Sequence, residues 1–189
     1  MSELLKKLMM MRQLSFSEGE ISLLRQRVYI APLEIIKPIT DMMLENPKLI
    51  PEIYERIRTT FNKGWADGVR EVYGFKPKDY FKWLIDIANI AGWGKSELVT
   101  FDEKKYEGTF RTFNALLGKE YKEKTPIPVD HLWRGLTAGG LTQAFAQDID
   151  WLETKCLAMG DPFCEFDFKP RTQFIANQSL QVKLQLPIK

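Results

Sequence analysis

The sequence predicts an α+β fold in which helices pack on an antiparallel β-sheet that ends in a cysteine-containing hairpin. Apolar residues at helical spacing dominate residues 33–91 and return at residues 129–147. Two strand-like segments, 97–101 and 106–113, are separated by a short charged turn, as expected for an antiparallel pair. Both cysteines of the chain flank a single turn near the C-terminus.

Length and charge describe one soluble domain. The chain has 189 residues, which is the size of a single domain. Its 27 Lys and Arg residues nearly balance its 25 Asp and Glu residues, so its charge gives no reason to expect nucleic-acid or membrane-surface binding. Charged residues interrupt every apolar stretch before the roughly 18 residues that span a bilayer. We therefore expect no membrane span and a cytoplasmic protein with reduced thiols.

The first thirty residues combine a helix and a strand. Residues 3–14 mix leucine and methionine with lysine and arginine, which predicts a short amphipathic helix. Residues 19–30 are rich in β-branched side chains and predict a strand that ends at Ala31-Pro32. We take residues 1–19 as an N-terminal helical extension.

Helices follow one another through the middle of the chain. Apolar spacing predicts helices over residues 33–46, 51–73, 78–91, 114–123 and 129–147. Gly74 and Gly92 are expected to end the second and the third of these. In the last helix Gly135 and Gly139 lie four residues apart on one face, at a cost of about 1 kcal/mol each in helix propensity. They predict close approach of another backbone.

The chain closes with a hairpin and a polar tail. Residues 149–158 and 163–168 are predicted strands joined by a Gly-Asp-Pro turn. Beyond them, residues 180–186 alternate apolar and polar side chains, which predicts an edge strand, either added to the sheet or exchanged between subunits. We therefore expect one domain over residues 20–169 and a C-terminal tail over residues 170–189.

The terminal hairpin gathers Glu153, Cys156 and Cys164, three candidate metal ligands. Thiolates select zinc-like ions, and a carboxylate can complete the coordination shell. A fourth ligand must come from elsewhere in the chain. Glu153 and Cys156 are three residues apart, so in a regular strand they face opposite sides, and joint ligation requires a bulge or an early strand end.

Other states of the two cysteines stay open. Without a bulge, Cys156 is a small buried hydrophobe, as free cysteine often is. Cys156 and Cys164 also flank a turn, where Cα separations of about 4.5 to 5.5 Å suit a disulfide in an oxidising or hyperthermophilic setting. A nucleophilic thiol is disfavoured, because burial raises the pKa of a thiol. The chain carries no phosphate loop or nucleophile elbow, and we expect no enzymatic activity.

A series of short motifs runs in order through the second half of the chain: Phe113-Asn114, Pro128-Val-Asp-His131, Arg134-Gly135, Ala138-Gly139, Glu153-x-x-Cys156 and Gly160-Asp161-x-x-Cys164-x-Phe166. With these motifs, residues 106–168 resemble the 4-vinyl reductase domain family, which is related to phenol-sensor ligand-binding domains and to subunits of the TRAPP vesicle-tethering complex. The resemblance implies a ligand-binding domain of the NO-signalling and Golgi-transport type. Such domains are usually dimeric, with a buried pocket for a hydrophobic small molecule.

The resemblance also implies a metal-ligand set. In phenol-sensing relatives zinc is held by Cys, Glu, Cys and Cys, and the last three carry over to Glu153, Cys156 and Cys164. The first cysteine falls at Asp130, where a carboxylate replaces a thiolate and weakens the selectivity for a soft metal. His131, the single histidine of the chain, is the rival fourth ligand.

For function, the resemblance implies a sensor or carrier module that binds a hydrophobic ligand and acts through a separate partner, with the metal site as a structural staple. An alternative is a dimerisation or assembly subunit whose pocket is filled by side chains. An accessory role in tetrapyrrole vinyl reduction rests on the family name alone. Aromatic side chains are the candidate pocket lining, although at such spacing they are more often core: Trp65, Tyr73, Phe75, Tyr80, Phe81, Trp83, Trp93, Phe110, Phe113 and Trp133.

Overall fold

The computed structural model describes residues 3–23, 26–64, 77–176 and 179–187. It is an α+β fold built on a four-stranded antiparallel sheet in the order β4-β5-β7-β6, as the sequence predicts. The strands are β4 (Lys95–Asp102), β5 (Glu107–Phe113), β6 (Ile149–Lys155) and β7 (Cys164–Pro170). Along β7 buried and half-buried residues alternate, so one face of the sheet is apolar and the other carries charged side chains such as Glu165 and Asp167.

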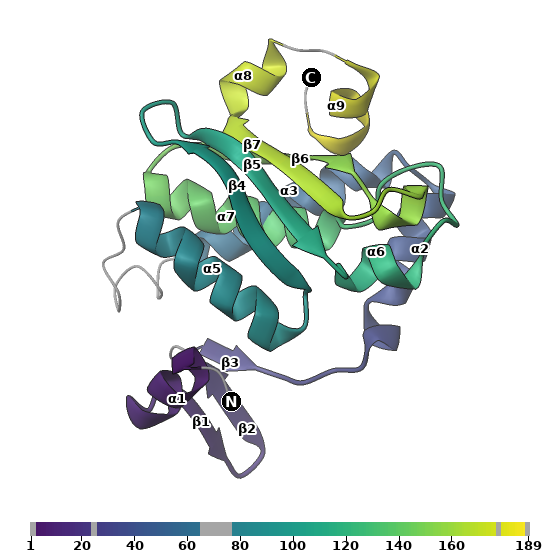
Figure 1. Ribbon diagram of the computed structural model, residues 1–189. Helices are drawn as coiled ribbons and strands as arrows, with labels where there is room; N and C mark the ends of the chain where they lie inside the picture. The colour runs from purple at the N-terminus through teal and green to yellow at the C-terminus, as the bar shows by residue number, and fades with distance from the viewer. Residues whose placement is uncertain (1–2, 24–25, 65–76, 177–178, 188–189) are drawn as a thin grey trace.

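Helices cover the apolar face of the sheet (Figure 1). They are α3 (Leu49–Lys63), α5 (Pro77–Ala91) and α7 (His131–Phe145), joined by the shorter η1 (Leu33–Ile35), α2 (Lys37–Glu45) and α6 (Leu116–Glu120). Phe81 of α5 contacts Phe168 of β7 with ring centroids 5.1 Å apart and Phe145 of α7 at 5.9 Å. This aromatic contact ties two helices to the sheet. The predicted helix over 51–73 ends at Lys63 with Gly64 as its C-cap, and residues 65–76 lie outside the described part.

The glycines of α7 bring α3 into close contact, as their spacing predicts. A Cβ on Gly135 would lie 2.9 Å from the side chain of Ile57, and one on Gly139 would lie 2.5 Å from the backbone oxygen of Arg58. Both distances are shorter than van der Waals contact, so only glycine permits this packing. The approach places α7 between α3 and α5, where its residues are almost all buried.

The N-terminal segment forms a small unit of its own beside the main body (Figure 1). Helix α1 (Glu3–Met10), which the sequence predicts, leads into a three-stranded antiparallel sheet of β1 (Leu14–Ser17), β2 (Glu20–Leu23) and β3 (Gln26–Val28). The single strand predicted over residues 19–30 is therefore wrong. Gly19 adopts a φ of 74° in the turn before β2, and the chain reverses again between β2 and β3. The expected domain boundary at residues 19 and 20 falls in the β1–β2 turn.

The C-terminal tail packs on the domain as two short helices, α8 (Arg171–Ile175) and α9 (Leu180–Gln185). The edge strand predicted for residues 180–186 is therefore wrong. Val182 and Leu186 are both buried, and their separation of four residues fits one face of a helix as well as it fits alternation. The Ser179 side chain accepts a hydrogen bond from the Val182 amide and so caps α9, which decides the ambiguity. Within the described ranges no helix is both long and apolar enough to cross a membrane.

Candidate functional site

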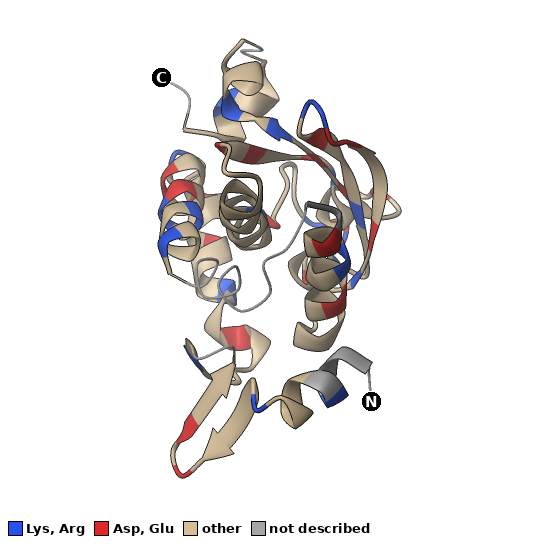
Figure 2. Ribbon diagram, turned by 90° about the vertical axis from the view of Figure 1, so that its left-hand side faces the viewer, with Lys and Arg blue, Asp and Glu red and all other residues tan. Residues whose placement is uncertain are grey.

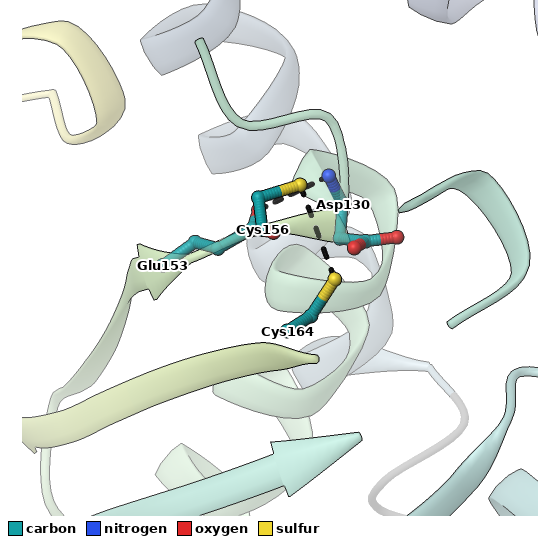
Figure 3. A group of neighbouring side chains, drawn as sticks. All are labelled: Asp130, Glu153, Cys156 and Cys164. Carbon is teal, nitrogen blue, oxygen red and sulfur yellow. Dashed lines mark hydrogen bonds between the residues drawn. The ribbon is translucent and has the colours of Figure 1, made fainter. Parts of the chain in front are cut away.

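Four acidic or thiol side chains meet at the end of the terminal hairpin (Figure 3). One ligand atom from each of Asp130, Glu153, Cys156 and Cys164 lies within 4.8 Å of the other three, and all four residues are buried. Asp130 is the N-cap of α7, Glu153 belongs to β6, Cys156 follows the end of β6, and Cys164 begins β7. The structure thus brings together the four residues singled out by the sequence.

A register shift in β6 turns Glu153 and Cys156 toward the same side. The pairing of β6 with β7 is irregular between Glu153 and Lys155, and the strand ends at Lys155. Because Cys156 lies beyond the end of β6, the alternation of side chains along the strand does not fix the side to which it points. The bulge that joint ligation requires is present.

The turn after β6 holds the two thiols close together. Cys156 donates its amide hydrogen to Oδ2 of Asp161 at 2.8 Å, and the amide of Asp161 donates to the Cys156 carbonyl at 3.2 Å. Gly160 supports this turn with a φ of 97°. The two Sγ atoms lie 3.9 Å apart as free thiols, and the Leu157 amide donates to Sγ of Cys164 at 3.3 Å. The structure therefore has no Cys156–Cys164 disulfide.

All four side chains of the cluster are buried, and each becomes negatively charged when it ionises. Burial raises the pKa of Asp130 and of Glu153, and for Glu153 the neighbouring Cys156 and Asp130 raise it further. Donation of a hydrogen bond to Cys156 and burial raise the pKa of Cys164. Oδ2 of Asp130 and Oε1 of Glu153 are buried without a hydrogen-bond partner among the described residues. The charge of Arg134 lowers the pKa of both carboxyl groups, but Arg134 donates no hydrogen bond to either of these two oxygens.

This donor set fits a divalent cation of zinc type. Two thiolates and two carboxylates give the same total charge as the four thiolates of common structural zinc sites, and carboxylate oxygen ligates zinc at about 2.0 to 2.2 Å. The backbone of α6 leaves room at the cluster, because a Cβ on Gly118 would lie 2.7 Å from Sγ of Cys164 and 3.2 Å from Oδ2 of Asp130. A cation bound by the four donors would give both orphaned oxygens a partner.

His131 points to a different contact. Its Nδ1 lies 3.0 Å from a guanidinium nitrogen of Arg134, which can only donate, so Nδ1 accepts. Burial and the Arg134 charge hold the pKa of His131 well below its usual range. The four-residue group found among the described residues does not include His131. The rival fourth ligand is therefore less well placed than Asp130.

Two buried polar residues that the sequence analysis did not single out as site residues, Arg134 and Gln185, form hydrogen bonds next to the cluster. Arg134 donates to the carbonyls of Trp151 at 2.6 Å and Gln185 at 3.1 Å, and its guanidinium lies over the Tyr54 ring. The Gln185 side chain accepts from the Glu153 amide at 3.0 Å and donates to the Glu153 carbonyl at 2.9 Å. The Arg134-Gly135 motif was the available signal for Arg134. Nothing in the sequence of the C-terminal tail indicated a role for Gln185.

A large cavity lies between the N-terminal unit and the helices α5 and α7. Its volume is about 930 Å³, and its walls are mainly apolar. Four of the aromatic residues named from the sequence line it: Tyr80, Trp83, Trp93 and Trp133. Phe81 and Phe110 are instead buried in the core, Phe113 contacts Phe163, and the remaining three lie outside the described residues.

Trp133, a residue of the cavity wall, carries a buried indole N–H. Its side chain is 4% exposed and stacks on Trp93 with ring centroids 5.3 Å apart, and both rings line the cavity. Nε1 of Trp133 has no hydrogen-bond partner in the part of the chain that the structure describes. A buried donor without a partner costs about 1 to 3 kcal/mol. A ligand in the cavity that carries a hydrogen-bond acceptor would give this N–H a partner.

Comparison with known proteins finds similarity in structure but not in sequence. No protein-family model matches the chain, and no curated protein matches it in sequence. Among solved structures, the chain is similar to the phenol-responsive sensory domain of the transcription activator PoxR with phenol, with a TM-score of 0.71 and 18% identity over 99% of this chain and 100% of that one.

Two further solved structures are similar over about three quarters of the chain. A trafficking protein particle complex subunit 3 from Naegleria fowleri, covalently bound to palmitic acid, has a TM-score of 0.51 and 12% identity over 73% of this chain and 92% of that one. A vinyl-4-reductase family protein from Methanocaldococcus jannaschii has a TM-score of 0.43 and 19% identity over 75% of this chain and 99% of that one. The predicted relation to phenol-sensing domains and to TRAPP subunits is confirmed at the level of fold.

Proposed function

We propose that the protein is a non-catalytic sensor or carrier module that binds a hydrophobic small molecule in the cavity between the N-terminal unit and α5 and α7. The observation that carries this proposal is the cavity of about 930 Å³ whose wall includes the unpartnered N–H of Trp133. A volume at the upper end of the range for ligand sites, with mainly apolar walls and few polar groups, is typical of small-molecule binding. The likeness to a phenol-responsive sensory domain supports the same role.

In this proposal Asp130, Glu153, Cys156 and Cys164 hold a zinc ion as a structural staple. The bound ion supplies charge neutralisation for four buried acidic groups. The residues of the chain do the positioning: Asp130 fixes the first turn of α7, and the hairpin residues fix β6 and β7. Trp133, which lines the cavity, lies one turn further along α7. The staple therefore fixes the helix that forms one cavity wall.

Assembly and location complete the proposal. The protein acts in the cytoplasm as a homodimer and passes the ligand signal to a separate regulatory or output protein. Occupation of the cavity changes how the N-terminal unit packs on α5 and α7, because that unit forms the opposite wall. The partner recognises this change in packing.

A neutral fluorescent probe tests the proposal. N-phenyl-1-naphthylamine should bind with a strong rise in fluorescence and saturate at one molecule per chain. Leu136→Trp, which places a larger side chain in the cavity wall, should weaken this binding at least tenfold, whereas Val99→Trp on the partly exposed strand β4 should not. Folded protein that binds no probe would overturn the proposal and leave an assembly role.

A further inference from the structure

Helix α9 of the C-terminal tail covers the outer edge of the sheet next to the four-residue cluster. Among the described strands β6 is the last in the order β4-β5-β7-β6, so one of its edges pairs with no strand. At Glu153 this edge bonds glutamine side chains instead. Gln185 accepts from the Glu153 amide at 3.0 Å, and Gln181 and Gln185 each donate to the Glu153 carbonyl at 2.9 Å. Helix α9 therefore holds the backbone of one of the four cluster residues.

Arg134 links the same helix to the first turn of α7. Its guanidinium donates to the backbone carbonyl of Gln185 at 3.1 Å and to that of Trp151 in β6 at 2.6 Å. Its own amide donates to the Asp130 carbonyl at 3.0 Å. Arg134 is the one charged residue within α7, and Figure 2 shows that helix near the middle of the molecule with almost no charged residues. Gln185 is thus bonded to both elements that supply the carboxyl groups of the cluster.

Helix α9 depends on these contacts for its position. It has six residues, and an isolated helix of this length is unstable in water. Val182, Gln185 and Leu186 are buried, whereas Leu180 is exposed, so the domain holds one side of the helix. A short terminal element of this kind opens more readily than the core. A change in the position of the Glu153 backbone therefore alters the fraction of molecules in which α9 is docked on β6.

Occupation of the cluster acts on Glu153 directly. Oε2 of Glu153 accepts from the Asp130 amide at 3.1 Å, whereas Oε1 is buried without a hydrogen-bond partner in the described chain. A divalent cation would give Oε1 a partner and fix the Glu153 side chain between β6 and α7. Without a cation Oε1 stays unsatisfied, so the side chain and the strand that carries it are less firmly fixed.

We propose that α9 is a switch element coupled to the cluster: a divalent cation in the cluster favours docking of α9, and docked α9 raises the affinity for the cation. This inference rests on the proposed metal site and adds its regulation. Gln185 is a positioning residue, because it bonds the backbone of Glu153 and not the cation. Such coupling is reciprocal, so the factor by which the cation favours docking equals the factor by which docking strengthens cation binding.

Hydrogen–deuterium exchange tests the coupling. Zinc added to chelator-treated protein at one equivalent should slow amide exchange in residues 180–186 about tenfold. Helix α1, at the opposite end of the molecule in Figure 1, should exchange at an unchanged rate. In Gln185→Ala zinc should bind about tenfold more weakly and should no longer slow exchange in α9. Leu180→Ala, at an exposed position of the same helix, should behave as wild type.

The outcomes separate this inference from the proposed metal site. Native mass spectrometry gives the zinc content. One zinc per chain without slower exchange in α9, or with equally slower exchange in α1, would overturn the coupling and leave the metal site in place. Unchanged zinc affinity in folded Gln185→Ala would overturn it as well. If Gln185→Ala does not fold, the wild-type exchange with and without zinc decides. A wild-type chain that binds no zinc would overturn the metal site and the coupling together, whereas binding of N-phenyl-1-naphthylamine still tests the cavity.

Discussion

The backbone amide of Asp130 donates a 3.1 Å hydrogen bond to Oε2 of Glu153, which joins the start of α7 to β6. The same contact holds two buried carboxyl groups close together, and each keeps one oxygen without a partner in the described chain. A pair of this kind is unfavourable in an apolar interior unless a cation or protons compensate it. The cluster is therefore either protonated or metal-bound, and the two states differ in stability.

Zinc should stabilise the folded protein. With free zinc at 100 to 1,000 times its dissociation constant, the free energy of unfolding should rise by about 3 to 4 kcal/mol over the chelator-treated protein. Cys156→Ser should abolish most of this gain, because it removes one of four donors. Denaturant unfolding with and without zinc measures it. A gain that survives in Cys156→Ser would mean that zinc binds elsewhere.

The fourth ligand can be assigned by a paired substitution. Asp130→Ala should reduce bound zinc from one ion per chain to well below one, whereas His131→Gln should leave the stoichiometry at one, because His131 is held by Arg134 rather than by the cluster. Native mass spectrometry of both variants gives the zinc content. The reverse result would transfer the ligand role to His131.

Gly118→Ala should damage the cluster without removing a donor. The added Cβ would lie 2.7 Å from Sγ of Cys164, so the thiol or α6 must move. We expect a loss of about 1 to 3 kcal/mol in the free energy of unfolding and weaker zinc binding. Calorimetric zinc titration checks the second effect. Unchanged zinc affinity in a folded Gly118→Ala protein would show that α6 does not shape the site.

Removal of the Gln185 side chain should lower the free energy of unfolding, because α9 is bonded to β6 through this residue. Gln185→Ala leaves the Glu153 amide without its side-chain acceptor and leaves the Glu153 carbonyl with one side-chain donor, Gln181, in place of two, which should cost about 2 kcal/mol. Leu180→Ala, at an 85% exposed position of the same helix, should change stability by less than about 0.5 kcal/mol. Urea unfolding compares the two variants. Equal effects would mean that α9 contributes nothing specific at Glu153.

Acid should weaken the protein through Glu55. Burial raises the pKa of Glu55, but hydrogen bonds from Arg58 and Arg171 outweigh it and hold the pKa at about 2. A carboxyl group whose folded pKa lies below its unfolded value stabilises the fold above the unfolded pKa, and this stability is lost as pH falls toward 2. Allowing for partial exposure, the contribution is roughly 2 kcal/mol. Glu55→Gln should therefore lower stability at pH 7 and have little effect near pH 2; an equal loss at both pH values would contradict the ion-pair explanation.

The sequence predicts the main elements of the fold well where a local pattern is compatible with a single secondary structure. Helix α5 begins and ends within one residue of its predicted bounds, since Pro77 and Gly92 mark both ends. The hairpin of β6 and β7 follows from its turn, and the proximity of Asp130, Glu153, Cys156 and Cys164 follows from motif order together with the bulge that the donor spacing requires. These features depend on residues that are close in sequence or on ordered motifs.

Prediction fails where tertiary contacts decide. The residues of α9 satisfy both strand alternation and a helical face, and only the Ser179 cap and burial of Val182 settle the outcome. The cavity lining could not be selected from the aromatic residues, because Phe81 and Trp83 are two residues apart on one helix yet one is core and the other lines the cavity. The cavity wall that the N-terminal unit forms depends on hairpins that the sequence pattern did not reveal.

The most direct test of ligand binding next to Trp133 is the indole N–H spectrum of the ¹⁵N-labelled protein. The chain has five tryptophans, and the Trp133 resonance is assigned by its absence in Trp133→Phe. On addition of 2-naphthol, which carries an acceptor oxygen on an apolar body, the Trp133 resonance should shift downfield as its N–H gains a partner. The resonance of Trp151, which is buried in the sheet and does not line the cavity, should stay in place. A saturating concentration of 2-naphthol that leaves the Trp133 resonance unshifted would contradict ligand binding next to Trp133.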